Sequence, residues 1–321
     1  MSSMIEVRGL VKKFGRTVAL DGVDLAVRTG TVIGVLGPNG AGKTTMVRIL
    51  ATLLRPDAGS ATVAGFDVVA DPVPVRGLIG LTGQYASVDG DLTGTENLLL
   101  IGRLSGLSSS VARRRATELL ERFGIGEIAS RAAGTYSGGQ RRRLDLAASL
   151  IGEPRVLCLD EPTTGLDPYV RWELWKVVRG LVADGVTAVL TTQYLEEADR
   201  LADRITVLDQ GQVVAEGTAD ELKRRVGGQT VQVRPSVPSD RGAVARTMEK
   251  VAGTAPSADP ATGMLSASLN DPVLLSTLVR RLDQAGLTVD ELALRLPSLD
   301  EVFLALTGSR AERQLPEGSK V

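Results

Sequence analysis

The segment that most limits what this chain can fold into is GPNGAGKT, at residues 37–44. It follows Thr31–Leu36, which is apolar on both faces like a fully covered strand, and it leads into a predicted helix over Gly42–Leu54. Strand, glycine-rich loop and helix in this order form a phosphate-binding loop, because glycines let backbone N–H groups converge on an anion at the positive end of the helix dipole. The sequence therefore predicts an α/β fold that binds phosphate groups.

The loop also predicts roles for its own side chains. Lys43 is expected to reach the β- and γ-phosphates of a nucleotide, and the Thr44 hydroxyl is expected to ligate Mg²⁺. An ordinary glycine-rich turn is the alternative, and the flanking strand and helix argue against it. The predicted nucleotide-binding residues here are Gly37, Pro38, Asn39, Gly40, Ala41, Gly42, Lys43, Thr44 and Thr45.

A second apolar strand ends on two carboxylates. Val156–Leu159 is followed directly by Asp160 and Glu161. Asp160 is predicted to anchor Mg²⁺, directly or indirectly, and Glu161 is predicted to polarise a water for attack on the γ-phosphate. A strand that ends in Asp-Glu is common by itself, but together with the phosphate loop it predicts ATP hydrolysis.

A second glycine-bearing helix start lies further along the chain. Ser137, Gly138, Gly139 and Gln140 open a predicted helix, and a helix N-terminus of this kind is an anion site. Because the phosphate loop already supplies one cradle, the second is expected to serve the nucleotide of another copy. The sequence therefore predicts a head-to-tail homodimer with ATP between the subunits.

The chain divides into two predicted domains. Residues 4–226 form the first, with a helical subdomain at about 86–150 inserted into a mixed-sheet core. Composition shifts at Gly227–Gly228, and residues 229–308 read as a small α+β domain that closes with Ser298 capping a short helix. Residues 309–321 form a polar tail, expected to be flexible. The helical runs of the subdomain are Glu96–Leu104, Val111–Phe123 and Ser137–Leu150.

Composition excludes several kinds of site. Lys+Arg 37 against Asp+Glu 38 leaves a net charge of −1, and aromatic residues make up 3%, so neither charge nor stacking side chains point to nucleic acid. The chain has no histidine and a single cysteine, Cys158, which excludes imidazole chemistry and an internal disulfide. No run of about 18 apolar residues occurs, so a cytoplasmic protein that reaches the membrane through a partner is expected.

Taken together, these motifs resemble the ATP-binding cassette (ABC) ATPases over roughly residues 4–222. The resemblance implies a P-loop ABC ATPase domain and assigns further residues. Phe14 matches the aromatic residue that stacks on adenine, with Val18 nearby. Gln84 matches a glutamine that ligates Mg²⁺ and water and senses the membrane partner. Ser137–Gln140 match the family signature, with Tyr136 where the family usually has leucine, and Asp167 matches a loop that crosses the dimer.

Gln193 departs from the family pattern, because that position usually holds a histidine. A glutamine amide can donate a hydrogen bond to a γ-phosphate but cannot change its charge. Glu161 is therefore expected to remain the base, while Gln193 positions and senses the phosphate. A surface amide at a helix start is the alternative interpretation.

Two longer segments, TTQYLEEADRLADRI and SLDEVFLALTG, resemble the daunorubicin/doxorubicin-resistance group of drug-exporter ATPases. The resemblance implies an ATP-hydrolysing subunit that works with a separate ABC-2-type membrane permease at the cytoplasmic face of the membrane. The SLDEVFLAL segment is also expected to pack on its own sheet, or to serve regulation or dimer contact.

Two other functions remain open from the sequence. One is a soluble ABC ATPase that acts on ribosomes or DNA, although such relatives usually carry two cassettes or a long coiled coil. The other is an importer ATPase whose C-terminal domain is regulatory.

Overall fold

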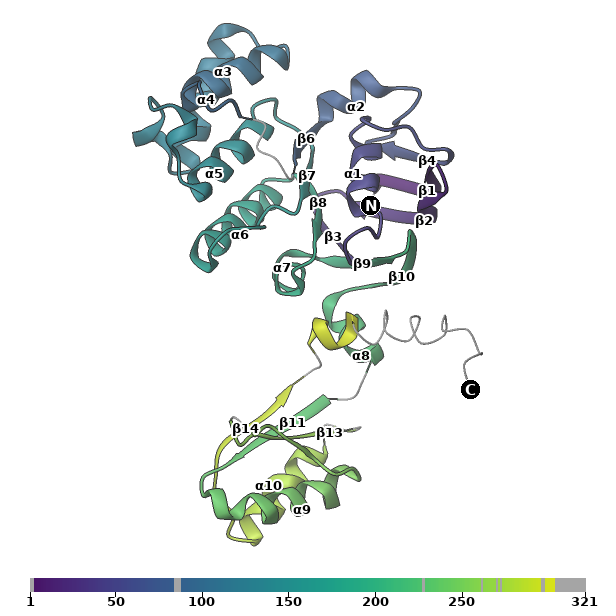
Figure 1. The fold of residues 1–321 in the computed structure, drawn as a ribbon, viewed down its shortest axis with the longest axis vertical. Coiled ribbons are helices and arrows are strands. Elements are labelled where there is room, and N and C mark those ends of the chain that lie inside the picture. Colours follow the sequence, from purple (N-terminus) through teal and green to yellow (C-terminus); the bar gives the residue numbers. More distant parts are fainter. Residues whose placement is uncertain are drawn as a thin grey trace, which may run out of the picture. The chain divides into compact units, whose positions relative to one another are not determined.

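In this computed structural model, the described residues are 3–83, 88–226, 229–260, 262–269, 271, 273–295 and 298–303. The chain divides into two compact units, Met1–Thr218 and Ala219–Val321 (Figure 1). Helix α8 (Ala219–Val226) belongs to the second unit by this division, whereas the composition shift at Gly227–Gly228 placed it in the first. Helix α8 thus makes its contacts mainly within the second unit, although the change in composition comes only after it.

The first unit is built around a six-stranded sheet with strand order β10-β9-β3-β8-β7-β6. The strands from β9 to β6 are parallel, and only β10 is antiparallel to its neighbour, so the sheet is mixed as predicted. Every residue of β3, β7 and β8 is buried, as expected for strands covered on both faces. The strands are β3 (Val32–Leu36), β6 (Ile79–Thr82), β7 (Val156–Asp160), β8 (Thr187–Thr192), β9 (Arg204–Asp209) and β10 (Gln212–Gly217).

A second sheet of four antiparallel strands has the order β2-β1-β4-β5. Helix α1 (Lys43–Leu50) shares one apolar core with both sheets, in which Met46 and Leu50 join Ile5 of the four-stranded sheet and Val35 of the six-stranded sheet. Packing against both sheets fixes the direction of α1 and therefore the position of its N-terminus. The strands are β1 (Ser3–Phe14), β2 (Thr17–Arg28), β4 (Ala58–Val63) and β5 (Phe66–Asp67).

Helix α1 is shorter than the predicted span of Gly42–Leu54. Thr52 adopts a left-handed backbone with φ 60°, and the Leu53 N–H donates to the carbonyl of Arg48 at 2.8 Å. This is a helix-ending hydrogen-bond pattern, so the chain turns away before Pro56.

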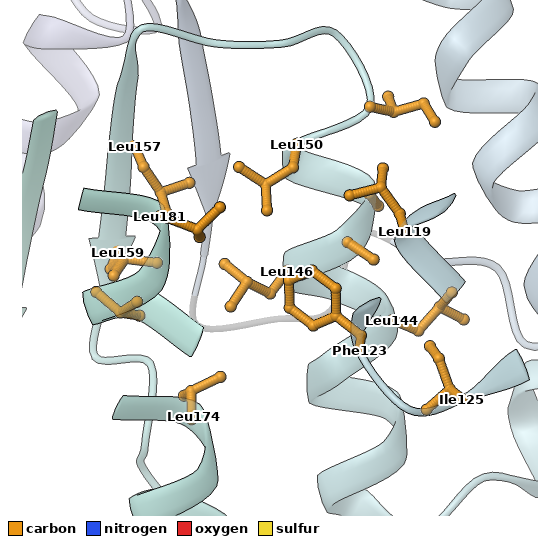
Figure 2. Close-up of a cluster of buried hydrophobic side chains, with 14 of the residues drawn as sticks. Leu119, Phe123, Ile125, Leu144, Leu146, Leu150, Leu157, Leu159, Leu174 and Leu181 are labelled. Carbon is orange, nitrogen blue, oxygen red and sulfur yellow. The ribbon is translucent and has the colours of Figure 1, made fainter. Parts of the chain in front are cut away.

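On the opposite face of the six-stranded sheet, the strands share a core with helices α3 to α7, whereas Val75 of α2 joins the core of α1. Successive residues of β7 alternate between the two cores: Val156 and Cys158 join the core of α1, while Leu157 and Leu159 join the helical core (Figure 2). In that core Phe123 and Leu146 also pack. The helices of this unit are α2 (Pro72–Leu78), α3 (Gly94–Leu104), α4 (Ser109–Arg122), α5 (Gly138–Ser149), α6 (Pro168–Ala183) and α7 (Leu195–Leu201).

The helical subdomain matches the predicted runs closely. Thr93 and Glu96 form a reciprocal capping box at the start of α3, and the Ser108 hydroxyl accepts the N–H of Val111 at the start of α4. Among the described residues of 88–150 no strand occurs, in agreement with the loss of strand pattern in the sequence.

The second unit contains an antiparallel sheet with the order β12-β13-β11-β14. Val231 and Val233 of the sheet share a core with Val244 and Leu278 of the two helices. Strand β12 has only two residues and pairs with the edge of β13. Ser298 and Glu301 form the predicted reciprocal cap of residues 299–303. The elements are β11 (Gln229–Pro235), α9 (Arg241–Ala252), β12 (Ser257–Ala258), β13 (Leu265–Leu269), α10 (Leu274–Gln284) and β14 (Val289–Arg295).

Within the described residues, no helix combines the length and apolar character that crossing a membrane requires.

Candidate active site

The phosphate loop joins β3 to α1, and two of its glycines are required by close backbone contacts. A Cβ on Gly37 would lie 2.3 Å from the Leu208 carbonyl oxygen. A Cβ on Gly42 would lie 2.3 Å from the Ala19 carbonyl oxygen, and Gly42 has φ 106°. Only glycine fits at these two positions. The loop is therefore pressed against β2 and β9 with its backbone close to the N-terminus of α1.

The other loop residues divide by exposure. Pro38, Asn39 and Gly40 are exposed at the tip, and Ala41 is buried beneath it. Thr45 is half-buried in the first turn of α1. Because the N-cap position is Gly42, this turn has no side-chain cap among the described residues. Its N–H groups are thus the kind that bind an anion at a helix start.

Lys43 is nearly buried, with 4% of the residue exposed. Its Nζ donates to the carbonyl oxygens of Gly37 at 2.7 Å and Pro38 at 3.1 Å, and lies 3.8 Å from Glu161 Oε1. Burial lowers the pKa of Lys43, while the negative charges of Glu161 and Asp160 oppose that shift. The ammonium therefore lies in the same small site as the two carboxylates.

Asp160, at the end of β7, accepts hydrogen bonds from two hydroxyls. Thr44 Oγ1 donates to Asp160 Oδ1 at 3.1 Å, and Thr191 Oγ1 donates to the same oxygen from β8. A carboxylate beside a hydroxyl is the oxygen donor set that Mg²⁺ prefers. No group of three or more His, Cys, Asp and Glu residues that could hold a metal occurs within the described part of the chain. These residues therefore suit a cation that takes its other ligands from phosphate or water.

Glu161 follows in an unusual backbone conformation. Its φ is 50°, which is uncommon for a residue with a side chain and costs on the order of 1–3 kcal/mol. Its N–H donates to the Thr191 carbonyl at 3.0 Å and to Thr191 Oγ1 at 3.2 Å, which holds this conformation in place. This backbone conformation directs the Glu161 carboxylate toward Lys43.

Thr191 is a site residue that the sequence patterns did not identify. It contacts both carboxylate residues, because β8 lies beside β7 and Asp160 pairs with Thr191 in register. In the sequence, this position was marked only by two consecutive threonines, Thr191 and Thr192, that follow the apolar residues of the strand.

Phe14 and Val18 lie on either side of the β1–β2 turn. Phe14 is 50% exposed and Val18 is 41% exposed, and Lys12 Nζ lies 5.6 Å from the centre of the Phe14 ring. An aromatic ring that remains half-exposed at a turn is available for stacking on a flat base. Core packing, the usual role of a phenylalanine, does not apply here.

The second glycine-bearing helix start is at α5. Ser137 Oγ accepts the Gln140 N–H at 3.2 Å, while the Gln140 side chain accepts the Ser137 N–H at 2.9 Å. A Cβ on Gly138 would meet nothing within 4 Å, whereas a Cβ on Gly139 would lie 2.8 Å from a methyl group of Val170. Ser137 and Gly138 are exposed, so they face outward, while Gly139 permits α5 to approach α6.

Tyr136, in place of the usual leucine, is buried directly before Ser137 and fixes the segment that leads into α5. Its hydroxyl donates to the Ile128 carbonyl at 2.8 Å, and burial raises its pKa. The neutral phenol therefore acts as a packed hydrogen-bond donor here.

The remaining predicted residues lie on other segments. Asp167 caps α6, with its Oδ1 accepting the Val170 N–H at 2.9 Å. Gln193 is exposed directly after β8, and the next residue, Tyr194, donates its N–H to Thr192 Oγ1 at 2.9 Å. Gln84 lies outside the described residues. The structure thus brings Lys43, Thr44, Asp160 and Glu161 into one cluster by contacts within the chain, and places the other described residues on separate elements.

A phosphate loop on a buried strand, with a pair of carboxylates at the end of a parallel strand two positions away in the same sheet, defines the class of ATP-hydrolysing P-loop domains. The family described as "ABC transporter" matches residues 20–164, and the family described as "ATP-binding protein DrrA1-3-like, C-terminal domain" matches residues 217–307.

Curated relatives cover almost the whole chain. Daunorubicin resistance ATP-binding protein DrrA2 of Streptomyces coeruleorubidus is 54% identical over 96% of this chain and 96% of its own length. Doxorubicin resistance ATP-binding protein DrrA of Mycobacterium tuberculosis is 48% identical, over 96% of this chain and 95% of its own. Nod factor export ATP-binding protein I of Rhizobium sp. is 38% identical, over 96% and 98%.

Solved structures agree on the cassette. An ATP-binding cassette of an ABC transporter in its ADP conformation has a TM-score of 0.63 at 28% identity, covering 69% of this chain and 93% of its own. A dimeric cassette in a post-hydrolysis state with ADP and phosphate has a TM-score of 0.61 at 28% identity, covering 67% and 98%. The chain belongs to the DrrA-type family of ABC transporter ATP-binding proteins. It binds ATP and couples ATP hydrolysis to transport.

Proposed function

We propose that this chain powers the efflux of a drug, antibiotic or lipid-like compound, as the peripheral ATPase subunit of an exporter at the cytoplasmic face of the membrane. The names of the relatives support export, because they are resistance and Nod factor export proteins over nearly the full length. The single structural observation that carries the catalytic part of the proposal is the cluster of Lys43, Thr44, Asp160 and Glu161.

In this proposal the phosphate loop binds the nucleotide and Lys43 holds its terminal phosphates. The Lys43 ammonium exchanges its bonds to the Gly37 and Pro38 carbonyls for phosphate oxygens, which are better partners because they are charged. Phe14 stacks on the base, with Val18 beside it. The backbone N–H groups at the start of α1 bind phosphate oxygens.

Thr44 and Asp160 are proposed to hold Mg²⁺, and Gln84 joins them by family resemblance. When bound, Mg²⁺ neutralises charge that develops on the phosphates. Glu161 orients the attacking water and accepts its proton at the carboxylate. Its Oε2 already accepts a hydrogen bond from Thr164 at 3.4 Å, while Oε1 faces Lys43. Gln193 donates a hydrogen bond from its amide N–H to the γ-phosphate and remains neutral throughout.

The functional unit is proposed to be a head-to-tail homodimer. Ser137 and Gly138 are exposed at the start of α5, and an added atom on Gly138 would meet nothing within the chain. This leaves room for the γ-phosphate of a nucleotide that the second copy binds. Asp167 lies at the start of the neighbouring α6, in position to cross to the partner. Hydrolysis removes the shared phosphate contacts and releases the dimer.

An ABC-2-type permease is proposed as the membrane partner, docking on a groove in the first unit. The groove has a cavity volume of about 680 Å³ and lies between α2, β6, α3 and α5. Val73 and Leu104 on its rim are 69% and 79% exposed. Large apolar side chains exposed around a groove are typical of a surface that another protein covers.

The proposal is tested with two readouts. Glu161→Gln keeps the shape of the side chain but removes the base, so it is expected to form a stable dimer with ATP, observed by size-exclusion chromatography. Wild-type protein with ATP and Glu161→Gln with ADP serve as controls and are expected to elute as monomers. A monomeric Glu161→Gln–ATP complex would contradict the shared-nucleotide arrangement.

For export, the chain is co-expressed with an ABC-2-type permease in inside-out vesicles, and ATP-dependent uptake of daunorubicin is followed by its fluorescence. Lys43→Ala is expected to abolish uptake. Uptake that is equally fast in the wild type and in Lys43→Ala would contradict a role of this subunit in powering transport.

A further inference from the structure

Besides the phosphate loop, the proposed mechanism uses the loop that holds Asp167 and the segment that holds Gln193. The side chain of Arg171, on α6, contacts both of them. Arg171 Nη2 donates to the Leu166 carbonyl at 3.3 Å. The centre of the Arg171 guanidinium also lies 4.7 Å from the centre of the Tyr194 ring. Leu166 precedes Asp167 and Tyr194 follows Gln193, so the same planar group touches the neighbours of both residues.

Each of the two contacted segments is fixed by a further hydrogen bond. The Asp167 carbonyl accepts the Arg171 N–H at 3.0 Å, which ties the loop before α6 to the first turn of the helix. The Tyr194 N–H donates to Thr192 Oγ1 at 2.9 Å, which ties the segment after β8 to that strand. A displacement of either loop therefore changes the position of Tyr194 relative to Arg171.

A second contact, one helical turn further along, joins the same two elements. Trp175 Nε1 donates to Glu197 Oε1 at 3.1 Å, and Glu197 is fully buried. Residues four apart on a helix lie on the same face, so Arg171 and Trp175 present one face of α6 to Tyr194 and Glu197. Burial raises the pKa of Glu197, and its hydrogen bonds from Thr192, Trp175 and Thr163 oppose that shift, followed by the positive charge of Arg171.

We infer that Arg171 is a positioning residue that couples the Asp167 loop to the placement of Gln193. When a second copy of the chain engages Asp167, Arg171 transmits the displacement through Tyr194 to the residue that holds the γ-phosphate. Arginine suits this role because its planar group stacks on a ring and donates an in-plane hydrogen bond at the same time, which lysine cannot do. The inference rests on the roles proposed above for Asp167 and Gln193.

The test compares ATP hydrolysis by Arg171→Lys, Tyr194→Leu and the double variant. We expect kcat to fall roughly 2- to 30-fold, the range for residues that carry coupling between sites. The KM for ATP is expected to change by less than about twofold, because none of these residues is placed at the phosphate loop. The double variant is expected to be no slower than the slower single variant, since both remove the same contact. Tyr194→Phe is expected to retain wild-type kcat, because it keeps the ring.

The same helix provides a matched control. Lys176 Nζ lies 3.2 Å from the centre of the Trp172 ring, and this cation–ring pair is on the solvent side of α6, where Trp172 is 46% exposed. Lys176→Gln and Trp172→Leu remove an interaction of the same kind and are expected to leave kcat unchanged. Thermal unfolding of all variants shows whether a loss of activity follows a loss of stability.

Three results would overturn the inference. Wild-type kcat in Arg171→Lys, while Gln193→Ala is slow, would overturn it and leave the proposed function intact. If kcat falls equally in the Arg171 and Lys176 variants, and the fall follows the decrease in their unfolding temperatures, Arg171 has a purely structural role. Wild-type kcat in Gln193→Ala would overturn the proposed role of Gln193 itself, and the inference with it.

Discussion

The two helix starts of the first unit that are predicted to bind phosphate, those of α1 and α5, are built differently. At α1 the N-cap is Gly42 in a left-handed conformation, without a side-chain cap and pressed between two sheets. At α5 the N-cap is Ser137, whose hydroxyl and backbone N–H are both used in a capping box with Gln140. The first helix start is ready for a phosphate, whereas the second already satisfies two of its own donors.

This difference implies an order of events. The backbone N–H groups of the α1 site bind a nucleotide without rearrangement, because packing between two sheets has already fixed them, and only the Lys43 ammonium exchanges its hydrogen-bond partners. At the α5 site the Ser137 oxygen accepts the Gln140 N–H while its O–H can still donate to a phosphate, and we expect that phosphate to come from the second copy. A single chain is therefore expected to bind ATP, and only the pair is expected to hydrolyse it efficiently.

The largest effect is expected from the α1 side. Lys43→Ala removes the buried ammonium that faces the phosphates, and ATP hydrolysis is expected to fall on the order of 10²–10³-fold or more. Phosphate release and ATP binding are measured together, with the exposed Lys250→Ala of α9 as a control. Near-normal turnover in Lys43→Ala would show that α1 is not the primary phosphate site.

The next effect tests the α5 side against a matched helix cap. Ser137→Ala is expected to reduce ATP hydrolysis roughly 10- to 150-fold by removing one hydrogen bond to a charged phosphate. Ser108→Ala removes the equivalent N-cap of α4. Both variants are expected to lose about 1 kcal/mol of unfolding free energy. If Ser108→Ala loses as much activity as Ser137→Ala, the loss comes from the helix cap rather than from phosphate binding.

A third comparison separates the two glycines of α5. Alanine at Gly138 meets nothing within the chain and is expected to leave the unfolding temperature unchanged or slightly higher, since alanine favours a helix. ATP hydrolysis is nevertheless expected to fall roughly 5- to 50-fold, because the added methyl group crowds the partner's phosphate. Gly139→Ala meets Val170 and is expected to lower the unfolding temperature instead. The reverse pattern would place the open surface at Gly139.

The smallest effect is expected at Gln193, which belongs to neither helix start. Gln193→His is expected to keep kcat within about threefold at pH 8, because a neutral imidazole also donates one hydrogen bond. Below about pH 6.5 the variant gains a charge that the wild type cannot gain, so only the variant is expected to change its kcat through that range. A large gain in turnover would instead show that glutamine slows the wild-type enzyme.

The extent of prediction from the sequence differed between segments. The β3–loop–α1 unit could be predicted because its strand, its glycine-rich loop and its helix follow one another directly in the sequence, although the close contact of Gly37 with Leu208 is visible only in the structure. The sequence patterns did not predict α6, and they indicated α7 only through the helix start considered for Gln193. Helix α6 is rich in valine and tryptophan, which favour strands by local propensity, and its helical form is set by the Asp167 cap and by burial of Leu174 and Val178.

By itself the sequence determined where phosphate can bind and which carboxylates stand at the end of a buried strand. These follow from the spacing of glycines and from continuous runs of apolar residues, and both can be recognised along the chain. Only the tertiary structure decided that Thr191 holds both carboxylate residues, that Gly139 admits Val170, and that Arg171 contacts two loops. Those contacts join residues far apart or on different elements, and they exist because strands pair in one register and helices pack on one face.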